Sequence, residues 1–432
     1  MTARAPTPPM GWNSFDCYGT SVTEAEVMAN AEVMARDLLP YGWNTVVIDI
    51  QWSDPLARAG GYRPDADLVM DSYARLLPAA NRFPSTEAGQ GFRPLADRIH
   101  ALGLKFGIHI MRGIPRRAVS RRLPVFGTSY TADEIADTCS LCPWNTDMYG
   151  LNMAHPGAQA YYDSILALYV QWGVDYIKAD DFLYPYHTRE IEGISRAVQT
   201  CGRDIMLSLS PGNELSLEHA EHLKAHCDLW RISADFWDRW EDVYAQFDRL
   251  RDWSPYAGEG RWPDADMLPL GRLGIRGEVG TDRQSLLTPD EQRTLMTLWA
   301  MARSPLMMGG DLPSLDPYTR SLLSNPALIA LNQASHNNHE VWRDESVVVW
   351  LAEAFNTPAY YVAIFNRGDN PAAYELRLDS IGIQRHCHWL DLWEDRTVEM
   401  QDSYNLTLMP HSCRLLCAVW SERSGAEGRT AR

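Results

Sequence analysis

Residues 43–49 read WNTVVID, a run that is mostly apolar and β-branched and ends on an acid. Similar runs occupy residues 104–110 (LKFGIHI), 174–180 (VDYIKAD), 205–210 (IMLSLS) and 229–233 (LWRIS). Segments with helical patterns alternate with strands along the chain, among them 22–38, 92–102, 156–172, 189–201 and 290–302. Near-continuous apolar strands with helices between them predict a parallel sheet that is covered on both faces.

The number of strands distinguishes the two common α/β architectures. Short strands near residues 9–12, 266–268 and 305–308 bring the total to eight, which predicts an α/β fold of the (β/α)₈ (TIM) barrel type. The alternative, a doubly wound sheet, is expected to carry a glycine-rich phosphate loop after its first strand. No such loop follows residues 9–12, so the barrel is favoured.

The pattern changes after residue 332. Short strands at 347–351, 360–366, 373–378, 388–392 and 412–419 follow one another without long helices, which predicts a small antiparallel β-sandwich. We therefore expect a catalytic barrel over residues 1–332 and a β-sandwich over 333–421. The polar, Gly- and Arg-containing tail at 422–432 is expected to be disordered.

Composition and charge exclude several classes of protein. The 432 residues are 45% hydrophobic and 22% charged, as in soluble globular proteins, and a net charge of −17 argues against a nucleic-acid partner. No apolar run is long enough to cross a membrane. The opening MTARAPTPPM lacks the apolar core of a signal peptide, which predicts a cytoplasmic protein; secretion is the alternative if a signal was removed.

The cysteines and histidines predict no metal or cofactor. Cys139 and Cys142 form a lone C-x-x-C with no second pair at zinc spacing. The cluster 386–388 (HCH) lies in a strand-like stretch, where scattered surface and core residues are the favoured interpretation. The remaining cysteines are isolated, as in a reduced protein.

Acidic and other polar residues recur where the predicted strands end. In a barrel these ends share one rim, which carries the active site. One such aspartate is commonly a helix cap, but several on one rim repel one another unless function requires them. The residues at the strand ends are Asp49, Trp52, His109, Arg112, Lys178, Asp180, Asp181, Ser208, Ser210, Arg231, Asp235, Asp264 and Asp266.

Two carboxylates surrounded by polar and aromatic side chains are what glycoside hydrolysis requires, one attacking the anomeric carbon and the other protonating the leaving oxygen. Trp12, Phe15, Trp52 and Trp237 lie close to the strand ends in sequence. Aromatic rings stack on the C–H faces of sugars, although a buried tryptophan is more often part of the core.

Several ordered motifs resemble glycoside hydrolase family 27, the α-galactosidase family. The opening PPMGWNSF (8–15) is similar to that family's P-P-M-G-W-N-S-W, and NRFP (81–84) with GLKFGI (103–108) resembles its next motifs. WGVDYIKAD (172–180) and WRISAD (230–235) resemble the segments that end on the nucleophile and on the acid/base. WPDADML (262–268) and the pair LWA (298–300) and SPL (304–306) match further motifs, so the resemblance covers nearly the whole chain.

This resemblance implies a (β/α)₈ barrel with a C-terminal β domain and a retaining, metal-free exo-glycosidase that uses double displacement. Asp180 is implied to be the nucleophile and Asp235 the acid/base. From the resemblance and the strand-end positions together, we expect a carbohydrate substrate to be bound by Trp12, Phe15, Asp49, Trp52, His109, Arg112, Lys178, Ser210, Arg231 and Asp266.

Departures from the family pattern concern the identity of the sugar. The family usually has two adjacent acids after the second strand, which hold the 4- and 6-hydroxyls of galactose; here they are Asp49 and Ile50. The family's C-E-W after the fifth strand, which helps to read the 2-position, is replaced by residues 210–212 (SPG). Because hydrogen-bond partners carry such discrimination, plain α-galactosides are expected to be modest substrates at best.

From the family resemblance, an α-galactoside-like pyranoside is the first expectation for the substrate. The alternatives are a β-L-arabinopyranoside, an α-N-acetylgalactosaminide, and an α-glucoside or isomaltosyl unit. Two other classes are a non-catalytic sugar-binding protein and a lyase that uses Lys178 as a Schiff base.

The longer segment 113–150 carries Arg116, Arg117, Arg121 and Arg122, which we expect to pair with local acids at the surface. Arg112, in contrast, is expected to line the pocket with His109.

Overall fold

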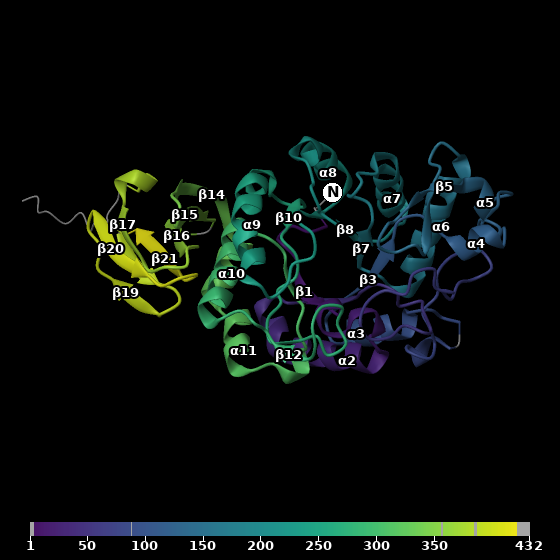
Figure 1. Ribbon diagram of the computed structural model, residues 1–432, viewed down its shortest axis with the longest axis horizontal. Coiled ribbons are helices and arrows are strands. Elements are labelled where there is room, and N and C mark those ends of the chain that lie inside the picture. The colour runs from purple at the N-terminus through teal and green to yellow at the C-terminus, as the bar shows by residue number, and fades with distance from the viewer. Residues whose placement is uncertain (1–3, 88, 356, 384–386, 421–432) are drawn as a thin grey trace, which may run out of the picture. The chain divides into compact units, whose positions relative to one another are not determined.

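The computed structural model describes residues 4–87, 89–355, 357–383 and 387–420. The tail 422–432 and His386, for which the sequence analysis made predictions, lie outside these residues. An eight-stranded parallel sheet in the order β10-β9-β8-β7-β3-β2-β1-β13 forms the centre of the first part of the chain (Figure 1). Its strands are β1 (Met10–Asn13), β2 (Thr45–Ile48), β3 (Lys105–Met111), β7 (Tyr176–Asp180), β8 (Met206–Leu209), β9 (Leu229–Arg231), β10 (Trp262–Asp264) and β13 (Leu306–Met308).

The sheet closes between its two end strands. Leu268 follows β10 and forms a parallel bridge with Met308 of β13. The Leu268 amide donates to Met307 O at 2.7 Å, and the Gly309 amide donates to Leu268 O at 3.0 Å. This closure confirms the predicted (β/α)₈ barrel. The strand expected at 266–268 instead occupies 262–264, because Asp266 adopts a left-handed backbone (φ 83°) that ends β10.

The strands are buried on both faces, as the apolar runs predicted. Every residue of β1, β2, β8, β9, β10 and β13 is buried. The opening motif contributes Gly11, whose backbone lies against β2. A Cβ atom at Gly11 would come within 2.2 Å of Thr45 O, so this position requires glycine.

Helices cover the outside of the barrel (Figure 1). A capping box starts α2, in which Thr23 and Glu26 satisfy each other's backbone amides. Gly173, in the left-handed conformation, ends α6 and starts the turn into β7. The predicted helices 22–38, 92–102, 156–172 and 189–201 are confirmed. The main helices of this part are α2 (Glu24–Val33, extended by a π turn over Met34–Leu38), α3 (Arg93–Ala101), α6 (Pro156–Trp172), α7 (Thr188–Thr200), α8 (Ala220–His226), α9 (Trp240–Trp253) and α11 (Pro317–Leu323).

The long segment after β3 forms a small subdomain of its own. It contains β4 (Ile114–Pro115), α4 (Arg116–Ser120), α5 (Ala132–Ile135), β5 (Ala136–Leu141) and β6 (Met148–Leu151), with the strands in the order β4-β6-β5. Its arginines pair with acids at the surface, as predicted. The pairs are Arg116 and Arg117 with Asp65, Arg121 with Asp67, and Arg122 with Asp133.

The chain divides into two compact units, Met1–Leu287 with Ser304–Ser324, and Thr288–Arg303 with Asn325–Arg432. The second unit contains α10 (Pro289–Ala302), α12 (Pro326–Gln333) and two antiparallel sheets whose apolar side chains share one core, as predicted for a β-sandwich. The larger sheet has the order β14-β15-β16-β21-β18-β19, and β17 pairs with β20. These strands are β14 (Ser335–Arg343), β15 (Val347–Ala354), β16 (Ala359–Asn366), β17 (Ala372–Arg377), β18 (Cys387–Asp391), β19 (Arg396–Val398), β20 (Ser403–Leu408) and β21 (Cys413–Trp420).

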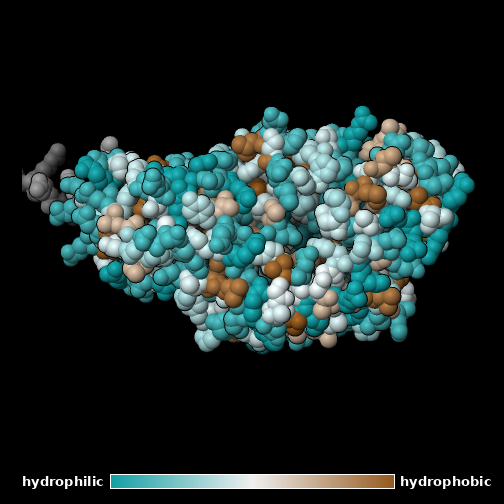
Figure 2. Space-filling view, in the orientation of Figure 1, coloured by the Kyte–Doolittle hydropathy of each residue, from teal (hydrophilic) through white to brown (hydrophobic). Residues whose placement is uncertain are grey.

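The face of the molecule in Figure 2 is mainly hydrophilic, with apolar residues in small scattered groups. Among the described residues, no helix combines the length and apolarity needed to span a membrane. All eight cysteines are free thiols.

A buried ion-pair network fixes the ends of β3 and β7. Arg112, directly after β3, donates from Nε to Asp181 Oδ2 at 3.0 Å and from Nη1 to Glu190 Oε1 at 2.5 Å, and its Nη2 lies 2.8 Å from Asp181 Oδ2. Glu190 of α7 also accepts from Tyr162 Oη of α6 at 2.9 Å. Only 1% of the Arg112 side chain is exposed, and burial raises the pKa of Asp181 to about 7 although Arg112 opposes this. The network therefore joins two barrel strands to two outer helices.

We expect Arg112→Ala to lower the free energy of unfolding by about 3–5 kcal/mol, because two buried carboxyl groups lose their counter-charge. Denaturant unfolding at pH 7 measures the loss. The loss should shrink at lower pH, where protonation neutralises both acids. Arg121→Ala is the matched control, since its ion pair is exposed and contributes at most about 1 kcal/mol. Equal stability of the two variants would contradict the structural role of Arg112.

Candidate active site

The polar residues predicted from strand ends converge on one rim of the barrel. All eight strands run parallel, so their carboxyl ends lie at the same edge. Neighbouring strands place these residues in register, with His109 opposite Lys178 and Met111 opposite Asp180. The structure brings together around this rim Asp49, His109, Lys178, Asp180, Arg231, Asp235 and Asp266 through the contacts described next. Asp264 is buried and lines a small cavity with Lys178, Arg231 and Asp266.

Asp49 and Lys178 form the central ion pair. Asp49 Oδ2 accepts from Lys178 Nζ at 2.8 Å and from Asn13 Nδ2 at 2.7 Å, and its Oδ1 accepts from the Ile50 amide at 2.8 Å. Burial raises the pKa of Asp49, but Lys178 and His109 hold it well below its ordinary value. Burial lowers the pKa of Lys178, but Asp49, Asp180 and Asp266 hold it well above its ordinary value. Lys178 is therefore a charged amine, which argues against a Schiff base.

Asp180, the last residue of β7, is held as a carboxylate. Its Oδ2 lies 3.1 Å from His109 Nε2, and its Oδ1 accepts from the Asp181 amide at 2.8 Å. Burial raises the pKa of Asp180, but the hydrogen bond from His109 and the charges of His109 and Lys178 keep it below its ordinary value. The side chain remains 14% exposed, compared with 2% for Asp49. Asp180 is thus an ionised group that a substrate can reach.

Arg231 of β9 connects two further acids. Its Nη2 lies 2.7 Å from Asp266 Oδ2 and 3.2 Å from Asp235 Oδ1. Asp266 also accepts from the Phe236 amide at 2.8 Å, and burial raises the pKa of Asp266 to about 6. Asp235 differs from the other acids because 43% of its side chain is exposed. The rim therefore presents one ionised, partly buried aspartate and one solvent-accessible aspartate, the combination that glycoside hydrolysis uses.

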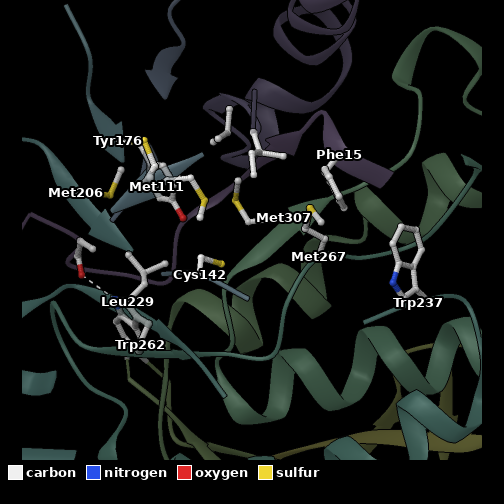
Figure 3. Close-up of a cluster of buried hydrophobic side chains, with 14 residues drawn as sticks. Phe15, Met111, Cys142, Tyr176, Met206, Leu229, Trp237, Trp262, Met267 and Met307 are labelled. Carbon is white, nitrogen blue, oxygen red and sulfur yellow. Dashed lines mark hydrogen bonds between the residues drawn. The ribbon is translucent and has the colours of Figure 1, made fainter. Parts of the chain in front are cut away.

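Aromatic side chains from separate loops gather beside this charged rim. The Phe15 ring centroid lies 5.9 Å from Lys178 Nζ, and the ring stacks on Tyr62 with centroids 5.9 Å apart. Trp237 lies on the same side of the cluster in Figure 3, 6.4 Å from Phe15. Trp144, from the segment after β3, packs on Tyr62 at 5.1 Å. The sequence analysis missed Tyr62 and Trp144, because both belong to long loops without a motif that would fix their position.

Three residues expected to bind substrate have their side-chain donors engaged within the protein. Trp12 is fully buried and donates from Nε1 to Gly310 O at 2.9 Å. Trp52 donates to His109 O at 2.7 Å. Each guanidinium nitrogen of Arg112 contacts Asp181 or Glu190. These hydrogen bonds and ion pairs hold the three side chains in place, and their contacts with substrate stay predictions.

Two further residues of the site region have unpaired polar atoms. Ser210 is buried, and its hydroxyl has no hydrogen-bond partner within the described part of the chain. The same is true of both carboxyl oxygens of Asp16, and burial raises the pKa of Asp16 well above its ordinary value. Asp16 is thus a buried acid with a raised pKa close to the charged rim, which the sequence analysis did not identify.

The interior of the barrel below the rim is filled mainly by large side chains. Figure 3 shows Met111, Met267 and Met307 lying between the strand residues on one side and Phe15 on the other. A cavity of about 20 Å³, large enough for one water molecule, remains among polar groups that include Lys178 and Arg231. A filled interior confines a substrate to the rim.

Comparisons with known proteins place this architecture in a family. Residues 120–334 match the family model of α-galactosidase A, and residues 344–418 match that of the α-galactosidase C-terminal β-sandwich domain. The chain is 27% identical over 421 residues to an α-galactosidase from Oryza sativa subsp. japonica, covering 95% of this chain and 84% of the relative.

Two solved structures are more similar. One is a family 27 β-L-arabinopyranosidase from Geobacillus stearothermophilus, 49% identical with a TM-score of 0.95 over 98% of both chains. The other is a putative α-N-acetylgalactosaminidase from Bacillus halodurans, 48% identical with a TM-score of 0.88 over 98% of this chain and 100% of the other. Because this identity extends over almost the entire chain and both of its domains, the protein belongs to glycoside hydrolase family 27.

Proposed function

We propose that the protein is a retaining exo-glycosidase that releases a terminal β-L-arabinopyranosyl residue. The observation that carries the proposal is the apolar side chain of Ile50 beside Asp49. Ile50 is 2% exposed and belongs to a buried cluster with Phe15, Met111 and Met148. A hydroxyl directed at this wall would lose its bonds to water without gaining a partner, at a cost of about 1–3 kcal/mol.

L-Arabinopyranose and D-galactopyranose differ in the group that would meet the apolar side chain of Ile50. L-Arabinopyranose has the ring and the 2-, 3- and 4-hydroxyl configuration of D-galactopyranose but lacks its hydroxymethyl group, and its β-L anomer corresponds to the α-D anomer of galactose. Asp49 remains to bind a ring hydroxyl. Ile50 stands where the family usually has the second acid, which binds the hydroxyl of the hydroxymethyl group. The wall therefore suits the pentose better than the hexose. The similarity to a β-L-arabinopyranosidase over 98% of both chains supports the same choice.

In this proposal Asp180 attacks the anomeric carbon and Asp235 first protonates the leaving oxygen and then deprotonates the attacking water. His109 and the Asp181 amide hold the nucleophile, and the contact with His109 and the charge of Lys178 keep it ionised against the effect of burial. The exposed side chain of Asp235 can reach a leaving group at the solvent side. Arg231, which contacts Asp235 and Asp266, orients the acid/base.

The catalytic pair can be tested with substrates whose leaving groups differ. Asp180→Ala should abolish hydrolysis of all glycosides. Asp235→Ala should slow the hydrolysis of substrates with poor leaving groups by about 10²–10⁴-fold. It should spare the glycosylation step of substrates with good leaving groups, because these need little protonation. Asp248→Ala on the exposed part of α9 is the control. NMR of the first product should show the β-L anomer; the α-L anomer would refute retention.

The identity of the sugar can be tested with nitrophenyl glycosides. The wild-type protein should prefer the β-L-arabinopyranoside to the α-D-galactopyranoside by roughly 10–200-fold in kcat/KM. Ile50→Asp should shift this ratio at least about tenfold toward the galactoside by supplying an acceptor for the hydroxymethyl group. Ile50→Val keeps the wall apolar and should keep the preference. Faster hydrolysis of the galactoside or of the α-N-acetylgalactosaminide by the wild-type protein would refute the assignment.

The pH dependence should report the contact between His109 and Asp180. Because that contact lowers the pKa of Asp180, its loss raises the pKa, and activity should then fall at a higher pH on the acidic side. We therefore expect His109→Ala to move the acidic limb of kcat/KM to higher pH. His109→Gln, which retains a donor, should move it less. An unchanged acidic limb in His109→Ala would show that His109 does not control the nucleophile.

A further inference from the structure

Two histidines and a glutamate face one another between the outer helices α7 and α8. His222 and His226 are four residues apart on α8, so they lie on the same side of the helix. Glu192 projects from α7 toward them. One potential ligand atom from each of the three side chains lies within 4.8 Å of the other two. None of the three belongs to the site described above.

The spacing of these atoms suits a shared cation better than direct hydrogen bonding. His222 Nε2 is buried and has no hydrogen-bond partner within the described residues; it lies 3.6 Å from Glu192 Oε1. The imidazole rings of His222 and His226 have centroids 4.4 Å apart. Two ligands bound to one tetrahedral zinc ion at about 2.0–2.1 Å are roughly 3.3 Å from each other. Small side-chain rotations would bring the three atoms to that separation.

The other nitrogen of His222 is already held. Tyr186 Oη lies 2.6 Å from His222 Nδ1, and the Tyr186 ring stacks on His219 with centroids 3.6 Å apart and planes 3° from parallel. Metal-binding histidines commonly have their second nitrogen fixed by such a partner, which orients the ring. Here the contact leaves Nε2 directed toward Glu192.

We propose that Glu192, His222 and His226 bind a divalent ion of the zinc class, with water completing its coordination. Two imidazoles and one carboxylate match zinc, whereas calcium and magnesium prefer oxygen ligands alone. Glu192 is 43% exposed and His222 23% exposed, so an ion and its water can enter from solvent. The sequence analysis expected no metal because it examined local spacings, and Glu192 lies 30 residues before His222 on another helix.

The consequence of binding follows from the position of Tyr186. This residue lies in the loop between β7 and α7, six residues after Asp180. An ion held by His222 ties the loop to α8 through Tyr186. Since the ion binds the folded chain, it should raise the temperature of unfolding. None of the three ligands belongs to the rim that carries Asp180 and Asp235.

Calorimetric titration of ZnCl₂ into chelator-treated, tag-free, full-length protein tests the proposal. The wild-type protein should bind one zinc ion in a single tight phase, and MgCl₂ should not compete. His222→Ala and His226→Ala should each weaken this phase at least about tenfold, and Glu192→Gln should weaken it less. His388→Ala and Cys139→Ser, which remove an exposed imidazole and an exposed thiol elsewhere, are the matched controls.

Thermal unfolding with and without zinc gives a second readout. Zinc should raise the unfolding temperature of the wild-type protein and of both controls but not of the His222→Ala/His226→Ala double variant. Circular dichroism without zinc checks that every variant is folded. If the double variant binds zinc as tightly as the wild-type protein, or if Cys139→Ser removes the binding, the assignment of these ligands is wrong.

Discussion

The burial of several acids beside few cations is the constraint around which this active site is built. Asp49, Asp180, Asp264 and Asp266 are held at one rim. Among the described residues, Lys178 pairs with Asp49, Arg231 with Asp266 and His109 with Asp180. The excess negative charge is relieved in two ways. Asp49 and Asp180 stay ionised beside Lys178, whereas burial raises the pKa of Asp264 and Asp266. Acids of one cluster therefore differ in how readily they take up a proton.

The fold makes this arrangement possible because the pairing register of neighbouring barrel strands fixes which side chains lie side by side. Pairing of β3 with β7 sets His109 opposite Lys178, and β1 supplies Asn13 to Asp49. Gly11 permits the close approach of β1 and β2, on which the contact between Asn13 and Asp49 depends. Arg112 joins the end of β3 to Asp181 and α7, and Asp181, the residue after Asp180, has a left-handed backbone (φ 66°).

Sequence patterns could predict the parts of this molecule that repeat a local rule. Apolar runs located the barrel strands, and strand ends with family motifs located Asp49, Lys178, Asp180, Arg231 and Asp235. Ion pairs between distant residues were beyond such patterns: the contacts of Arg112 with the buried acids Asp181 and Glu190 were not predicted. Tyr62 and Trp144 also escaped prediction, since their positions depend on how two long loops pack on each other. Contacts between residues distant in sequence, which no spacing encodes, account for these differences.

The two adjacent positions after β2 have unequal freedom to change, and this explains how one scaffold can serve different sugars. Asp49 is bound to Lys178, Asn13 and the backbone, so its loss would leave a buried ammonium group without its partner. Ile50 packs in an apolar cluster and takes no part in the ion pairs of the rim. A change at position 50 therefore alters what the wall can bind and leaves the charge balance of the catalytic groups intact. In the function we propose, the mechanism depends on that balance and the choice of sugar depends on the wall, so a change at position 50 alters substrate preference without rebuilding the chemistry.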